Sequence, residues 1–139
     1  ADYGGVVNAE YAGDVEIIES TVRNCSARHH GGVVYAWDSG TISMTDSNVT
    51  DCRGSNNGGI VYAWKSDSLS IAGVDFINNR ADRYGSVLYL EDINQPSSIS
   101  DASFAGNNGI TILTFNSPID WDCRLGSWMP TEGIYFGDF

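Results

Sequence analysis

The chain has 139 residues, enough for one domain with a real core, and its 18 acidic and 7 basic residues give a formal net charge of −11. This charge argues against binding of nucleic acid or of an anionic membrane surface, since both require clustered positive charge. No apolar run approaches the ~20 residues of a membrane span. No signal-peptide pattern opens the chain, so we expect any signal peptide to have been removed.

A motif of two small residues followed by two aliphatic residues recurs every 27 residues. Its four copies are Gly4-Gly5-Val6-Val7, Gly31-Gly32-Val33-Val34, Gly58-Gly59-Ile60-Val61 and Gly85-Ser86-Val87-Leu88. Self-similarity at a fixed period of this length indicates a solenoid, in which each unit buries its apolar face against its neighbours.

Three short strands are predicted in each repeat. The first covers residues 7–10, 34–37, 61–64 and 88–91, where residues at alternate positions are always apolar and therefore point inward. We expect the preceding aliphatic residues, Val6, Val33, Ile60 and Val87, to face outward. The second strand covers residues 15–17, 42–44 and 69–71, and the third centres on Val22, Val49 and Phe76. In the fourth repeat Phe104 comes one residue late, which indicates a single insertion near Pro96.

Three stacked strands per repeat predict an all-β fold, a parallel β-helix of about four coils within residues 1–108. Each coil should add ~4.8 Å along the axis, and each end of the stack is an open sheet edge that must be capped or paired. Residues 109–139 leave the repeat, and we expect an irregular segment that caps or links the solenoid.

The repeat also contains a second motif, seen as Phe76-Ile77-Asn78-Asn79 and Phe104-Ala105-Gly106-Asn107. In the first two repeats it becomes Val22-x-x-Cys25 and Val49-x-x-Cys52. Together with the glycine motif, this pattern resembles the repeats of polymorphic outer-membrane proteins over residues 4 to about 108. The resemblance implies a right-handed coil and an extracellular or cell-surface setting, and it implies no reaction.

Outward aromatic residues are the first candidate site. Tyr35, Tyr62 and Tyr89 share one column of the stack, and Trp37 and Trp64 share the next. A contiguous exposed aromatic strip normally marks an interface, and Tyr and Trp are enriched at binding hot spots. We weigh three uses of the strip: packing against another protein, stacking of sugars, or burial under the C-terminal segment.

A column of inward polar residues is the second candidate. It contains Cys25, Cys52, Asn79 and Asn107. Cys25 and Cys52 are one coil apart, close enough for a disulfide, with a reduced pair as the alternative. We expect the two asparagines to form a hydrogen-bonding ladder. The column has too few ligands for a metal ion, and Cys123 remains as an odd cysteine with a free thiol or an external partner.

Two N-glycosylation patterns are present, at Asn24 (Asn24-Cys25-Ser26) and at Asn48 (Asn48-Val49-Thr50). They agree with a secretory route, in keeping with the expected extracellular location.

Three classes of function compete. An enzyme is not expected, because Asp46, Asp51 and Asp75 occupy different places in the repeat and cannot stack into a paired-carboxylate site. We expect no catalytic residue and no cofactor. The favoured interpretation is a subunit or module of an extracellular filament or appendage, which binds copies of itself or neighbouring modules through the solenoid ends and the aromatic strip. The alternative is a carbohydrate-binding or adhesin module of a larger surface protein.

Overall fold

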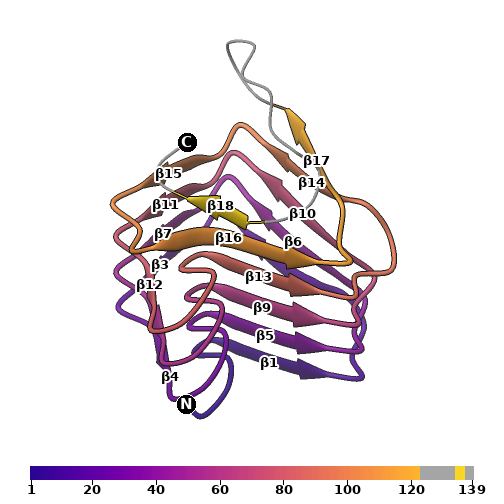
Figure 1. Ribbon diagram of the computed structural model, residues 1–139, viewed down its shortest axis with the longest axis horizontal. Coiled ribbons are helices and arrows are strands. Elements are labelled where there is room, and N and C mark those ends of the chain that lie inside the picture. The colour runs from indigo at the N-terminus through magenta and orange to yellow at the C-terminus, as the bar shows by residue number, and fades with distance from the viewer. Residues whose placement is uncertain (123–133, 137–139) are drawn as a thin grey trace.

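The computed structural model describes residues 1–122 and 134–136, and these residues form only β-strands, bridges and turns (Figure 1). The strands wind into a parallel β-helix, which confirms the predicted fold class. Their bounds in the first two coils are β1 Val7–Glu10, β2 Val15–Ile18, β3 Thr21–Arg23, β4 Ser26–Ala27, β5 Val34–Trp37, β6 Thr41–Thr45, β7 Asn48–Thr50 and β8 Arg53–Gly54. The others are β9 Val61–Trp64, β10 Ser68–Ala72, β11 Asp75–Ile77, β12 Arg80–Ala81, β13 Leu88–Glu91, β14 Ser97–Ser100, β15 Ser103–Ala105, β16 Ile110–Phe115, β17 Ile119–Asp122 and β18 Ile134–Phe136. Nothing in this described part is a helix that could cross a membrane.

The strands stack into four sheets, which we call A to D. Sheet A has the order β1-β5-β9-β13-β16-β18, and sheet B the order β17-β14-β10-β6-β2. Sheet C has the order β15-β11-β7-β3, and sheet D is a stack of three two-residue strands in the order β12-β8-β4. Sheet D was not predicted, because a two-residue strand is too short to show an alternating pattern.

The register confirms the period and the insertion. Val34 pairs with Val61 and Val61 with Leu88, each 27 residues apart, whereas Phe76 pairs with Phe104 at a spacing of 28. The coils also continue beyond residue 108, where the sequence analysis ended them. Leu88 pairs with Ile112, so β16 and β17 begin a fifth coil in sheets A and B. The repeat is shortened to 24 residues at this step, which is why the fixed period missed it.

The corners of each coil are made by residues with a left-handed backbone. Four columns of such residues have φ between 45° and 65°, a region that favours Gly, Asn and Asp. The columns are Gly4, Gly31, Gly58 and Gly85; Tyr11, Asp38, Lys65 and Asp92; Glu19, Asp46, Gly73 and Asp101; and Asn24, Asp51, Asn78 and Gly106. The repeated Gly, Asp and Asn of the sequence are therefore the residues that turn the chain from one sheet to the next.

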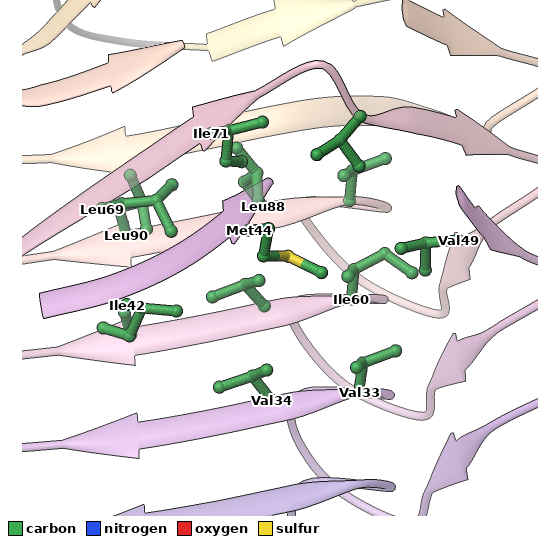
Figure 2. Close-up of a cluster of buried hydrophobic side chains, with 14 of the residues drawn as sticks. Val33, Val34, Ile42, Met44, Val49, Ile60, Leu69, Ile71, Leu88 and Leu90 are labelled. Carbon is green, nitrogen blue, oxygen red and sulfur yellow. The ribbon is translucent and has the colours of Figure 1, made fainter. Parts of the chain in front are cut away.

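Aliphatic side chains from successive coils fill the interior (Figure 2). They include Val34, Ile42, Met44, Leu69, Ile71 and Leu90, each almost completely buried. Val33, Ile60 and Val87 are also fully buried, so the prediction that they face outward was wrong. The reason is a bend at the start of each sheet A strand. The N–H groups of Val33 and Val34 both donate to the carbonyl of Ile60, at 3.0 and 2.8 Å, and two consecutive side chains then point inward.

Candidate interaction surface

Two aromatic ladders lie on the outer face of sheet A. The tyrosine ladder contains Tyr35, Tyr62 and Tyr89, with ring centroids 5.4 and 5.0 Å apart and interplanar angles of 7° and 6°. The tryptophan ladder contains Trp37 and Trp64, 5.7 Å apart at 9°. Exact register between β5, β9 and β13 produces both ladders, because identical side chains are placed directly above one another.

The tyrosine ladder is less exposed than the sequence predicted. Tyr35 and Tyr89 are each only 9% exposed, and Tyr62, Trp37 and Trp64 are half-buried. The expectation of an open aromatic strip was therefore wrong for Tyr35 and Tyr89. Each ring in the stack covers the face of its neighbour, and this lowers the exposed fraction of both side chains although they point outward. Among the described residues, the turn before sheet A adds cover, since the His30 ring lies 4.5 Å from that of Tyr62.

Exposed aromatic residues surround the two ladders. Tyr3 is 38% exposed and its ring lies 4.8 Å from that of Tyr35 in a tilted arrangement, and Tyr11 is 67% exposed and lies 4.9 Å from Trp37. Phe115, 49% exposed, lies 5.9 Å from Tyr89. Tyr84, 50% exposed, is in the turn before sheet A. Of the six large hydrophobic side chains that are exposed in the described part of the chain, these four thus gather around one face.

The edge where the sheet A strands end is acidic. In register, Glu10 and Glu91 flank the tryptophan ladder on either side, and the corner column beside it holds Asp38, Lys65 and Asp92. Burial, followed by the charge of Glu91, raises the pKa of Tyr89 to about 12 and also raises the pKa of Tyr62. The Lys65 ammonium group lies 4.9 Å from the centre of the Trp64 ring, a cation–π distance.

The edge where these strands begin is rich in arginine, which the sequence analysis overlooked. Arg53 and Arg80 pair in register on sheet D, and both contact the carboxylate of Asp82, at 2.5 and 3.1 Å. Arg28 and Arg83 lie in the turns that lead from sheet D to sheet A. Burial and then the charges of His29 and Arg83 lower the pKa of His30. The 27-residue spacing between Arg53 and Arg80 could have predicted this edge from the sequence, because residues one repeat apart lie in register.

The inward polar column behaves as a ladder of hydrogen bonds. The Asn79 Oδ1 atom accepts from the N–H of Cys52 at 3.0 Å, and its Nδ2 group donates to the carbonyl of Val49 at 2.9 Å. Asn107 does the same for the next coil, since its Oδ1 accepts from Asn79 N–H and its Nδ2 donates to the carbonyl of Phe76, both at 2.9 Å. The predicted asparagine ladder is therefore confirmed, and it secures the third corner of the coil.

The two cysteines of this column are free thiols in the structure, which has the reduced alternative and not the predicted disulfide. The N–H of Cys25 donates to the Cys52 Sγ atom at 3.4 Å, and that thiol donates to the carbonyl of Thr50 at 3.2 Å. Each sulfur thus occupies the place of an asparagine side chain in the ladder. Cys123 lies outside the described residues.

The buried thiol should resist alkylation. Burial raises the pKa of Cys52 to about 12, so only about 10⁻⁴ of it is thiolate at pH 8. We expect iodoacetamide to leave Cys52 unmodified in the native protein at pH 8 and to modify it fully in urea, as mapped by peptide mass spectrometry. Rapid labelling of Cys52 in the native state would contradict its place in the ladder.

The two N-glycosylation patterns lie in different environments. Asn24 is exposed at a corner of the first coil. Asn48 lies within β7 and is half-buried, and its Oδ1 atom is buried without a hydrogen-bond partner. Attachment of a glycan at either residue stays a prediction, and the structure favours Asn24.

The register, the four sheets and the stacked side-chain ladders define the class of protein, a parallel β-helix built from repeats. Searches against protein-family models, curated proteins and solved structures find no match for the chain. The likeness to polymorphic outer-membrane proteins therefore stays a prediction drawn from the sequence motifs.

Proposed function

We propose that the protein is a structural module of an extracellular or cell-surface assembly, in which copies of the module associate through the outer face of sheet A. The observation that carries this proposal is the gathering of exposed Tyr3, Tyr11, Tyr84 and Phe115 around two half-covered aromatic ladders. Exposed apolar patches of this kind are typical of interfaces between proteins. The extracellular setting rests on the repeat motifs and on the exposed Asn24 in its glycosylation pattern.

The carbohydrate-binding alternative has less support from the ring geometry. A sugar stacks on the open face of an aromatic ring. In both ladders the ring faces are occupied by neighbouring rings at 5.0 to 5.7 Å and nearly parallel, so mainly ring edges remain for a ligand. Ring edges pack well against the side chains of another protein.

Assembly through the solenoid ends is also weaker than the sequence suggested. At the far edge of sheet A, β18 pairs with β16 in the antiparallel direction, with Leu113 opposite Ile134 (Figure 1). This strand occupies the backbone groups of β16 that a further parallel coil would need. The face of sheet A therefore carries the proposal.

Replacing Trp37 and Trp64 together with serine tests the proposal. Both side chains are half-buried at the surface, so we expect the fold to survive and self-association to be lost, as measured by sedimentation velocity from 1 to 200 μM. Ile18→Ser is the matched control, since Ile18 is 51% exposed but lies on sheet B. Monomeric wild-type protein, or a double variant that associates like the wild type, would refute the proposed function.

A further inference from the structure

We infer that the partner on this face is a second copy of the chain, related by a two-fold axis parallel to the solenoid axis, so that the acidic edge of each copy meets the arginine edge of the other. This inference rests on the proposed function and adds the identity and orientation of the partner. The aromatic ladders supply the apolar centre of the contact, and the two charged edges select its direction.

The two edges carry opposite charge on either side of the ladders. The acidic edge follows the strands of sheet A and contains Glu10, Asp38, Glu91 and Asp92, together with the basic Lys65 between Asp38 and Asp92. The arginine edge precedes these strands and consists of Arg28, Arg53, Arg80 and Arg83. Asp2 pairs with Arg28 at 3.6 Å, and Asp82 pairs with both Arg53 and Arg80, so the arginines are compensated only in part.

Symmetry then decides the orientation. A two-fold axis that lies in the interface and runs along the solenoid axis reverses the strand direction of the second copy, so each acidic edge faces an arginine edge. A two-fold axis along the strands would instead place acidic edge against acidic edge, in a molecule whose net charge is already −11. Because like charges in direct opposition cost several kcal/mol, the first arrangement is favoured. It is isologous and closes as a dimer.

The size of the face sets the expected strength. From the turn before sheet A to the corner after it, about eight residues at ~3.3 Å give a width of about 26 Å, and five strands at ~4.8 Å give a height of about 24 Å. The buried area is therefore about 600 Å² per copy, at the lower limit for specific interfaces. We expect a dissociation constant in the micromolar range.

The weakening of each charge-reversal variant by itself tests the orientation, because a dimer with acidic edge against acidic edge already opposes like charges and would not be weakened by reversing one edge. Cross-rescue then tests that the weakening is electrostatic. In one variant, Arg28→Glu and Arg83→Glu make the arginine edge acidic. In the other, Asp38→Lys and Asp92→Lys make the acidic edge basic. Lysine suits these corner positions, because Lys65 occupies the same column with the same left-handed backbone. We expect each variant alone to dimerise at least about tenfold more weakly than the wild type.

An equimolar mixture of the two variants should form a heterodimer with wild-type affinity, because every acidic edge then meets a basic one. Sedimentation velocity with one variant fluorescently labelled measures this directly. Arg23→Glu on sheet C is the control for a change of charge elsewhere, and it should leave the dimer unchanged. A mixture that stays monomeric, or one that grows beyond a dimer, would overturn the two-fold arrangement.

The two proposals fail in different ways. If the wild type is monomeric throughout, the proposed function fails. If the wild type dimerises and the Trp37 and Trp64 variant does not, but charge reversal has no effect, only the orientation inferred here is wrong.

Discussion

Replacing Gly59 with alanine should lower the free energy of unfolding by about 3 kcal/mol or more. Gly59 lies where the third coil passes beneath the fourth. A Cβ atom at this position would overlap the backbone oxygens of Ser86 and Arg80. Both obstacles are main-chain atoms, that of Ser86 in the next coil and that of Arg80 later in the same coil, so no side-chain rotation can relieve the overlap and the backbone would have to move apart. With a total stability of about 5–15 kcal/mol for a domain, such a loss is severe.

Equilibrium unfolding in guanidinium chloride, followed by tryptophan fluorescence, measures this effect. Gly13→Ala is the matched control, because a Cβ atom at Gly13 would have no neighbour within 4 Å. We expect the control to change stability by no more than about 0.5 kcal/mol. Equal losses for the two variants would show that the tight passage at Gly59 is not what makes glycine necessary.

The fourth repeat has no glycine at the position equivalent to Gly59, and it shows where the need for glycine ends. Ser86 stands where the earlier repeats have the second glycine. Its N–H donates to the carbonyl of Ile110 at 2.7 Å, in the shortened connection that leads into the fifth coil. The chain above Ser86 therefore follows a different path from that above Gly59, and a Cβ atom has room there. The departure from the motif in the sequence marks the point at which the regular stack ends.

Much of the fold was predictable, because each coil repeats the same pattern of apolar, polar and turn residues. Alternation of apolar residues located the first three strands, and the late arrival of Phe104 located the insertion confirmed by its pairing with Phe76. Two features broke the pattern. The bend that turns both Val33 and Val34 inward depends on two N–H groups sharing one carbonyl of the next coil, a contact between coils that no single repeat encodes. The fifth coil was hidden by its shorter spacing.

The candidate site was predictable in its columns and not in its exposure. Register alone placed Tyr35 above Tyr62 and Trp37 above Trp64. Burial of Tyr35, however, comes from ring stacking and from Tyr3, a residue far away in the sequence. The arginine edge was missed for a similar reason. Arg28 and Arg83 belong to turns of different coils, and only the winding of the chain brings them to the same side of sheet A.

Asn79 is the second position at which a single change should have a large effect, since its side chain joins two coils within the buried interior. Asn79 is fully buried, and its amide accepts from the Cys52 N–H and donates to the Val49 carbonyl. Asn79→Ala would leave the Cys52 N–H buried without a partner and would remove the side-chain donor from the Val49 carbonyl, which also belongs to the β7–β11 ladder. An unpaired buried N–H costs about 1–3 kcal/mol and the lost side-chain volume adds to this, so we expect a loss of about 2–3 kcal/mol in the free energy of unfolding.

A graded series tests the hydrogen bond that the Asn79 side chain accepts. Cysteine already occupies this column at Cys52, where its Sγ atom accepts from the N–H of the coil below and donates to the carbonyl of Thr50. Asn79→Cys should therefore preserve a weak version of the bond accepted from the Cys52 N–H, while its thiol donates within its own coil and no longer to the Val49 carbonyl. We expect it to cost less than Asn79→Ala. Asn8→Ala, at an exposed residue of β1, is the control and should change little. Urea unfolding of the three variants measures the series, and equal losses for the alanine and cysteine variants at Asn79 would show that an acceptor for the Cys52 N–H does not stabilise this corner.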